Sequence, residues 1–324
     1  MLAFAIRRLV EALAVILAVA LIAFILFRFV GDPINQMVAQ DASLEDRLRL
    51  RQDLGLDDPV LLQFARFAAH AVKGDFGMSY QMKQPVVNLI AERFPATMEL
   101  ALAAMLIALA LGIPMGVYTA IHRDSWLAKA LLAVSLAGIS LPTFLIGILL
   151  IYLFAVVLHI FPAFGRGDVV AVGFWHTGLL TASGLRALVL PAITLSLFQM
   201  TLVTRLVRAE MLEVLRTDYI KFARARGLTE HAINYSHALR NTLVPVVTVI
   251  GLQLGSVIAF AIVTETVFQW PGMGLMFIQA VQAADIPVMA AYLILVGFLF
   301  VLINLAVDLL YLRIDPRLRA GSAS

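Results

Sequence analysis

The chain has 324 residues, of which 62% are hydrophobic and 14% are charged, and its mean hydropathy is +0.94. Soluble proteins carry about 45–50% apolar and about 25% charged residues, so this composition excludes an ordinary soluble domain and indicates a polytopic membrane protein. The net charge of +3 is too small to indicate nucleic-acid binding, and the absence of cysteine excludes disulfides, cysteine-ligated metal sites and thiol nucleophiles.

Six apolar stretches are long enough to cross a bilayer as helices, because the hydrocarbon core needs about 20 residues of helix. Pro142 lies inside the third stretch and predicts a kink there, which neighbouring helices would accommodate. We therefore expect an all-α polytopic membrane protein with six transmembrane helices. The six stretches are 9–30, 97–120, 130–158, 187–207, 243–264 and 287–311.

The first stretch follows Arg7 and Arg8, which is also the basic start of a secretory signal peptide. Its apolar run is longer than the roughly 7–15 residues of a signal-peptide core, and no convincing small-residue cleavage site follows it. We interpret residues 1–30 as a retained N-terminal transmembrane helix.

Basic residues outside the spans predict the orientation of the chain. The short loops 159–186 and 265–286 carry only Arg166 and Arg186, whereas the alternate segments are richer in Lys and Arg. Because basic residues in short loops mark the cytoplasmic side, both termini are expected in the cytoplasm. The basic residues on that side are Arg7, Arg8, Arg123, Lys129, Arg208, Arg216, Lys221, Arg224, Arg226, Arg240, Arg313, Arg317 and Arg319.

The polar segment 31–96 then lies outside the cytoplasm. Ser43 and Gly55 predict the start and end of one helix, and Asp58-Pro59 and Gly74 predict those of a second. Two interpretations stay open: a small helical cap packed on the membrane domain, and a docking surface for an extracytoplasmic partner. The second helix has an amphipathic face made of Leu61, Phe64, Phe67, Ala68 and Ala71.

Charged residues in or beside the spans are expensive and often functional. Glu11 and Glu99 lie near span starts, where their side chains are expected to reach the headgroups. Asp308 is expected to pair with Arg313 at the inner interface. Glu265, at the outer end of the fifth span, is a candidate for the substrate entrance.

Small and polar residues inside the spans suggest where helices meet and where a path runs. Gly112 with Gly116, and Gly251 with Gly255, have the Gly-x-x-x-Gly spacing that predicts close helix packing. Few central groups are ionisable, which suits a weakly selective polar path. Candidate residues for that path are Gln199, Gln253, Ser256 and Glu265.

The loop 208–242 has the signals of a helix, a tight turn and a second helix. Residues 210–226 are good helix formers, Gly227 fits the position after a helix end, and Thr229 can cap a helix running to about Arg240. On these grounds alone, the loop either touches lipid headgroups through its basic residues or presents a structured surface to a partner.

The loop resembles the EAA loop of permease subunits of ATP-binding-cassette importers. Ala223, Gly227 and Leu239 match the general pattern, whereas Lys221-Phe222-Ala223 and His237-Ala238-Leu239-Arg240 depart from it in the same way as the peptide-transporter branch. Motifs along the whole chain look like that branch, and the chain is identified as similar to its first, B-type, permease subunit. They include 54–57, 74–77, 93–97, 140–144, 190–192, 218–220, 223–228, 237–241, 265–268, 270–274 and 315–317.

The resemblance implies a type I importer permease fold, with an N-terminal helix 1–30, an outer segment 31–96, a core 97–311 and a cytoplasmic tail 312–324. It implies a bacterial inner-membrane protein that pairs with a second permease, one or two ATP-binding subunits and an extracytoplasmic binding protein. ATP and magnesium would bind to the ATPase subunits, so no cofactor, metal or catalytic residue is expected in this chain. The residues that it assigns to ATPase coupling are Tyr219, Ala223, Arg224, Ala225, Arg226, Gly227, Leu228, His237, Leu239 and Arg240.

Other function classes fit less well. The sequence has no Gly-x4-Gly-Lys-Ser/Thr phosphate loop and no His-Glu-x-x-His motif, which argues against an ATPase and a zinc protease. The alternative is an ion-coupled secondary transporter, which would show paired carboxylates at mid-membrane and inverted repeats with matching broken helices. The cargo stays open among dipeptides, oligopeptides, glutathione, nickel chelates and sugars.

Overall fold

The computed structural model describes residues 2–29, 43, 45 and 57–314, and the predicted helix between Ser43 and Gly55 falls outside this range. Packing divides the chain into two compact units. One comprises Met1–Pro95 with Gly272–Leu302, and the other comprises Ala96–Pro271 with Ile303–Ser324. The predicted four-part division at residues 30, 96 and 311 concerns position relative to the membrane, and it stays a prediction.

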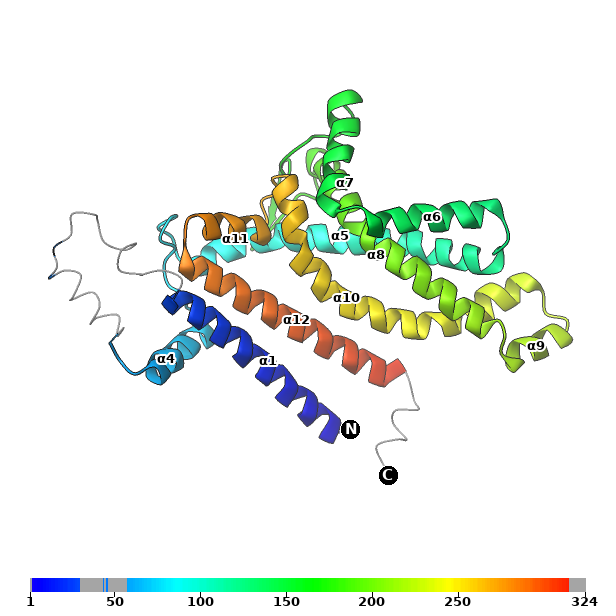
Figure 1. Ribbon diagram of the computed structural model, residues 1–324, viewed down its shortest axis with the longest axis horizontal. Coiled ribbons are helices and arrows are strands. Elements are labelled where there is room, and N and C mark those ends of the chain that lie inside the picture. Colours follow the sequence, from blue (N-terminus) through cyan, green and yellow to red (C-terminus); the bar gives the residue numbers. More distant parts are fainter. Residues whose placement is uncertain (1, 30–42, 44, 46–56, 315–324) are drawn as a thin grey trace. The chain divides into compact units, whose positions relative to one another are not determined.

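The first unit is a set of helices around a small apolar core. Gly297 lies so close to Val19 that an added Cβ would stand 3.0 Å from the valine side chain, so α12 packs directly on α1 (Figure 1). The core includes Val86, Leu89, Met276, Ala280 and Val288. The helices are α1 (Leu2–Phe29), α4 (Val60–Val72), the first part of α5 (Val86–Ile121), α11 (Met273–Gln282) and most of α12 (Ile286–Ile314).

The second predicted helix of the outer segment is confirmed as α4. It begins at Val60, and its N-cap is Pro59 rather than the expected Asp58, whose carboxylate instead pairs with Arg66 at 2.6 Å. The apolar face packs through aromatic side chains, since the Phe24 ring lies 5.5 Å from that of Phe64 and 5.8 Å from that of Phe67. Leu61, which the pattern placed on this face, is 79% exposed.

The second unit carries most of the membrane-spanning helices. Its core includes Leu100, Leu195, Val203, Val257 and Ala261. Besides residues 96–121 of α5 and the end of α12, it contains α6 (Trp126–Ser140), α7 (Thr143–Leu150), the π-helix η1 (Ile151–Val157), β1 (Val170–Val172), β2 (Trp175–Thr177), α8 (Ala182–Val214), α9 (Asp218–Ala225), the π-helix η2 (Ala232–Ala238) and α10 (Leu239–Val267).

Four helical stretches in the described residues are long and apolar enough to cross a membrane, in agreement with the second, fourth, fifth and sixth predicted spans. α1 covers the first predicted span, but its described apolar part, Val10–Leu26, is shorter than these four, so that span stays a prediction. The four stretches are Val86–Ile121, Ala182–Val214, Ala232–Val267 and Ile286–Val307.

The third predicted span is not a single kinked helix. α6 and the helix formed by α7 and η1 meet at an angle of 109°, so the stretch is either a broken span or a re-entrant loop. The break falls at Leu141 and Pro142, because proline has no N–H to donate and also disfavours helical backbone at the residue before it.

The glycine spacing marks close helix contacts, as predicted. A Cβ on Gly112 would lie 2.9 Å from Val203, and one on Gly116 would lie 2.6 Å from Val207, so α5 and α8 pack almost backbone to backbone. A Cβ on Gly251 would lie 2.4 Å from Val307. At such contacts, any larger side chain would force the helices apart.

The loop between η1 and α8 contains a hairpin that the sequence did not predict. β1 and β2 pair antiparallel, with Val170 opposite Thr177 and Val172 opposite Trp175. Gly173, with φ of +63°, begins the two-residue turn between the strands, where a positive φ is required. The fold is otherwise helical in the described residues, as expected from the composition.

Candidate functional site

The segment 208–242 is built differently from the predicted pair of helices. The expected helix 210–226 is interrupted, since α8 ends at Val214 and α9 begins at Asp218. The Thr217 hydroxyl donates to the Val214 carbonyl at 2.6 Å, and the Thr217 N–H donates to the same oxygen at 3.1 Å. Threonine therefore takes the acceptor that a continuing helix would use, and α9 starts a new direction.

Gly227 terminates α9 as predicted. Its φ is +77°, its N–H donates to the Arg224 carbonyl at 2.9 Å, and the Leu228 N–H donates to the Ala223 carbonyl at 3.3 Å. This pair of bonds is a Schellman motif, which needs a residue with positive φ at the glycine position. No atom lies within 4 Å of the place where a Cβ would stand, so the requirement for glycine is conformational and not steric.

Thr229 caps the next helix, as predicted, but that helix does not stop near Arg240. The Thr229 hydroxyl accepts the Ala232 N–H at 3.3 Å, and the chain continues through η2 into α10 without a break. Pro245 lies inside α10. A proline is tolerated there because neighbouring helices in a membrane domain compensate for its missing hydrogen bond.

The short helix α9 has a buried side and an exposed side. Ile220 and Ala223 pack in the same core cluster as Met211 of α8 and Ile233 of η2. Of the ten residues assigned to coupling, only Ala223 is buried and Leu239 is half-buried, while the other eight are exposed. The packing thus holds α9 by its apolar side and presents the rest outward.

Two exposed aromatic residues belong to the same surface although they were absent from the predicted set. Phe222 is 64% exposed, and the Arg226 guanidinium lies 5.8 Å from its ring centroid. Tyr235, on η2, is 48% exposed. The signal for Phe222 was its spacing, three residues after Tyr219 and four before Arg226, which places all three on one side of α9.

An ion pair and a hydrogen bond tie the parts of the segment together. Across the turn, Arg224 donates to both carboxylate oxygens of Glu230, at 2.9 and 3.3 Å. This hydrogen bonding holds the pKa of Glu230 below its usual value and raises that of Arg224. The Asn241 amide donates to the Tyr219 hydroxyl at 2.7 Å, which links α9 to the start of α10.

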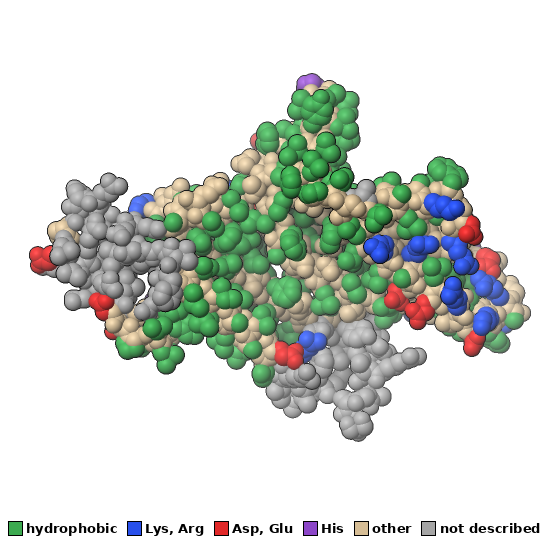
Figure 2. Space-filling model, viewed as in Figure 1, with side chains coloured by type: hydrophobic (Ala, Val, Ile, Leu, Met, Phe, Trp, Pro, Cys, Tyr) green, Lys and Arg blue, Asp and Glu red, His purple; other side chains and the backbone are tan. Residues whose placement is uncertain are grey.

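We name the exposed residues Tyr219, Phe222, Arg226, Leu228 and Tyr235 the α9 surface. It combines aromatic and aliphatic side chains with a cation, and Figure 2 shows further Lys and Arg side chains gathered at this end of the second unit. Exposed aromatic and arginine side chains are enriched at protein interfaces. The arrangement is suited to docking.

The candidate path residues lie in two environments. Gln199 is 5% exposed, and among the described residues its Oε1 has no hydrogen-bond partner. Gln253 and Ser256 are half-buried on α10. Glu265 is fully buried, and its Oε1 accepts the Thr97 hydroxyl at 2.6 Å, which gives it a packing role between α10 and α5. The assignment of these four residues to a substrate path stays a prediction.

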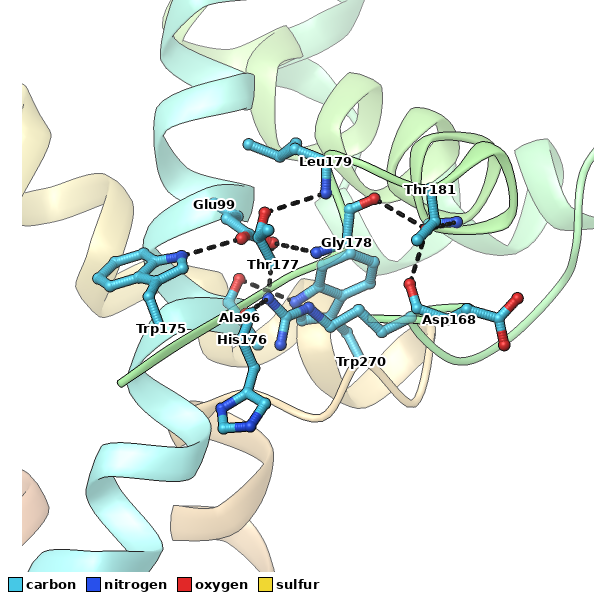
Figure 3. Close-up of polar contacts among 12 residues, drawn as sticks. Ala96, Glu99, Asp168, Trp175, His176, Thr177, Gly178, Leu179, Thr181 and Trp270 are labelled. Carbon is cyan, nitrogen blue, oxygen red and sulfur yellow. Dashed lines mark hydrogen bonds and ion pairs between the residues drawn. The ribbon is translucent and has the colours of Figure 1, made fainter. Parts of the chain in front are cut away.

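Glu99 does not reach the headgroups, which corrects the expectation from its position near a span start. It is 4% exposed, and its Oε2 accepts from Arg166 Nη2 at 2.6 Å. Trp175 Nε1 donates to its other oxygen at 3.1 Å (Figure 3). The charge of Glu99 is thus neutralised by Arg166 of the loop between η1 and α8, because a carboxylate buried this deeply needs a partner. Arg166 also donates to the His176 carbonyl at 2.6 Å.

The predictions for Glu11 and for Asp308 have different outcomes. Glu11 pairs with Arg8 at 3.3 Å on the exposed surface of α1. The predicted pair of Asp308 and Arg313 lies outside the described side chains.

Comparison with known families matches almost the whole chain. A family model described as "Binding-protein-dependent transport system inner membrane component" matches residues 112–320. A second, described as "Binding-prot-dependent transport system membrane comp, N-term", matches residues 1–101.

Individual relatives are similar from end to end. A permease protein of Brucella abortus (strain 2308), named for a peptide transport system, is 41% identical over 98% of this chain and 99% of its own length. The dipeptide transport system permease protein DppB of Escherichia coli (strain K12) is 38% identical over 98% of this chain and 99% of its own. DppB of Alkalihalophilus pseudofirmus is 35% identical over 98% and 100%, respectively.

A solved structure supports the fold. The chain superposes on a chain of the MetNI methionine ABC transporter in an inward-facing conformation, with a TM-score of 0.57 and 19% sequence identity. The match covers 70% of this chain and 96% of that one. At this level of identity the likeness concerns the fold alone.

Proposed function

Because this chain belongs to the family of inner-membrane components of binding-protein-dependent transport systems, we propose that it forms half of a translocation path for peptides or peptide-like solutes. The members of this family are multi-pass transporter permeases and not catalytic enzymes. A second permease subunit supplies the other half. Separate ATPase subunits drive transport through the segment 208–242, and an extracytoplasmic binding protein delivers the cargo.

The observation that carries this proposal is the construction of α9. A helix of eight residues is anchored by Ile220 and Ala223, closed by a glycine-dependent turn and braced by the Arg224–Glu230 pair. The helix α9 carries the α9 surface and lies in the chain between two long spans, α8 and α10. A force applied to such a helix is transmitted to both spans, because each is connected to it by only a few residues.

ATP and magnesium belong to the partner subunits in this proposal. The sequence has no phosphate-binding loop with which to hold a nucleotide. In this proposal α9 lies on the cytoplasmic side of the inner membrane, since the segment 208–242 carries six Lys and Arg residues, whereas the short loops 159–186 and 265–286 carry only Arg166 and Arg186. The peptide class of cargo rests on the names of the relatives.

The test is Gly227→Val in the assembled importer. Valine is unfavourable at positive φ by about 1–2 kcal/mol or more, so the turn after α9 should distort while the spans remain intact. We expect normal insertion in the membrane, weaker copurification of the ATPase subunits and at least about tenfold lower peptide uptake. Gly227→Asn should retain more activity, because asparagine tolerates this backbone region.

The matched control is Gly173→Val in the outer hairpin. Gly173 also has positive φ and also has no atom within 4 Å of an added Cβ, so the local strain is of the same kind. This variant should copurify with the ATPase subunits as the wild type does. Wild-type uptake by Gly227→Val, or equal loss of ATPase in both variants, would remove the case for α9 as the coupling element.

A further inference from the structure

A pocket between α6 and α8 shares no lining residue with the α9 surface or with the candidate path residues. It has a volume of about 420 Å³ and is lined by Leu132, Ser135, Leu136, Arg205, Arg208, Ala209 and Leu212. The lining is therefore amphipathic, with two guanidinium groups from α8 and aliphatic side chains from both helices. All seven residues belong to the second unit.

The pocket begins where the two helices cease to touch. The Thr201 hydroxyl donates to the Ser135 carbonyl at 2.5 Å, and a Cβ on Gly138 would lie 3.2 Å from the Leu197 carbonyl. These contacts hold α6 against α8 at one end of the pocket. Farther along α8, the positions facing α6 carry arginines, whose long side chains leave space between the helices.

Arg205 and Arg208 have no acidic partner in the described part of the chain. Among the residues that the structure describes, neither Arg205 nor Arg208 forms an ion pair, and the Arg208 Nε is buried without a hydrogen-bond partner. The acidic residues nearest in sequence, Glu210 and Glu213, are not three or four residues from Arg208 and so face other sides of α8. The two guanidinium groups therefore leave a positive charge beside the pocket that an anion from outside the chain would neutralise.

The surroundings indicate what kind of anion this is. Leu136 is 55% exposed and Arg205 is exposed, so the pocket opens on the surface of the helices. The neighbouring exposed residues of α6 are apolar, with Val134 62% and Ile139 41% exposed, as suits contact with lipid chains. Figure 2 shows basic side chains over the α6 and α8 end of the molecule, beside a largely hydrophobic surface.

We propose that this pocket binds the phosphate headgroup of an anionic phospholipid of the inner leaflet. The guanidinium groups of Arg205 and Arg208 donate to the phosphate oxygens, and the acyl chains lie along the leucines and the apolar face of α6. Basic pockets between transmembrane helices near the cytoplasmic surface are suited to such headgroups. The leaflet follows from the proposed orientation, and the pocket itself does not depend on the coupling role of α9.

The experiment is native mass spectrometry of the assembled importer released from bilayers containing phosphatidylglycerol and phosphatidylcholine in equal amounts. The wild type should retain phosphatidylglycerol in preference to phosphatidylcholine. Arg205→Gln with Arg208→Gln should lower that retention by about twentyfold, since each cation near an anionic headgroup is worth roughly a fivefold change in binding. Arg123→Gln with Arg216→Gln removes the same charge from exposed positions and should change retention less than about twofold.

A second variant tests the pocket without changing charge. Ala209→Trp places a bulky ring among the lining residues, and it should also displace the lipid while both arginines remain. Equal retention in the wild type and in both pocket variants would overturn the proposal. So would equal retention of the two lipids, displacement of the lipid by millimolar inorganic phosphate, or cross-linking of position 205 to an acidic residue of a partner subunit.

Discussion

The buried pair of Glu99 and Arg166 fixes the loop between η1 and α8 to α5 through charge as well as packing. Both side chains are at least nine-tenths buried, and the carboxylate also accepts from Trp175 Nε1 and from the Gly178 N–H. Glu99 and Arg166 are 67 positions apart in the sequence, and the fold brings them into contact in a buried site. Removing one partner leaves a buried charge that nothing else compensates.

We therefore expect Arg166→Met to destabilise the protein by about 3–5 kcal/mol, since methionine leaves the Glu99 carboxylate unpaired. The double variant Glu99→Gln with Arg166→Met should recover part of that loss, because it removes both charges. The measurement is the midpoint of thermal unfolding of the purified complex in detergent. Arg186→Met, at an exposed position nearby, is the control and should change stability by less than about 0.5 kcal/mol. A double variant no more stable than Arg166→Met would contradict this account.

The sequence indicated that burying the Glu99 carboxylate would be costly, but it did not indicate which residue neutralises its charge. The position near a span start suggested that the carboxylate reaches the headgroups. Its actual partner lies in a loop without helical or strand periodicity, and only the tertiary fold brings Arg166 to it. The positive φ of Gly227 and the cap at Thr229 were predictable, because both depend on hydrogen bonds within a few residues of the chain.

Among the elements, long apolar helices were predictable and breaks in them were less so. Spans two, four, five and six follow directly from hydropathy, since a bilayer imposes both length and composition on a helix. The interruption before α9 depends on one threonine hydroxyl competing for the Val214 carbonyl, which composition does not reveal. Conversely, the helix capped by Thr229 was expected to end near Arg240, where the structure instead continues from η2 into α10.

The bend after α6 was also only partly predictable from the sequence. Pro142 predicted a kink, but the angle of the bend depends on how the helices before and after Pro142 pack against the rest of the fold. Beyond it, the hairpin of β1 and β2 has only three residues in each strand, too few to show a period of two in sequence. Trp175 in β2 is held by Glu99, so this hairpin also depends on a distant partner.

For the whole molecule, the orientation across the membrane is a direct test of the six-span topology. Tags attached at Met1 and at Ser324 should both be cytoplasmic, and a tag inserted between residues 36 and 42 should be outside. The reason is the concentration of basic residues in alternate loops, which are retained on the cytoplasmic side during insertion. Accessibility of each tag to a protease added to sealed cells and to permeabilised cells provides the measurement. An external C-terminal tag would contradict the even number of spans.

Selectivity for cargo is the second property of the whole molecule. Thr201 and Thr204 donate their hydroxyls to carbonyls of helix α6 or α8, and Glu265 is held by Thr97, so three polar side chains of the spans are already occupied by packing. Gln253 and Ser256 are half-buried and remain candidates for contact with a solute. Neither residue is charged, so neither distinguishes strongly among peptides with different side chains.

We therefore predict that Gln253→Ala and Ser256→Ala change the uptake of two unlike peptides by the same factor, to within about threefold. The free energy of discrimination would then reside in the proposed extracytoplasmic binding protein and not in this chain. Glu265→Gln is the matched control for a packing residue, and it should lower the amount of assembled importer while leaving the ratio of the two uptake rates unchanged. The assay is uptake of both peptides by the assembled importer with one unchanged binding protein. If a single substitution abolishes uptake of one peptide and spares the other, a specific binding residue lies in this chain, because no difference in delivery remains to explain the ratio.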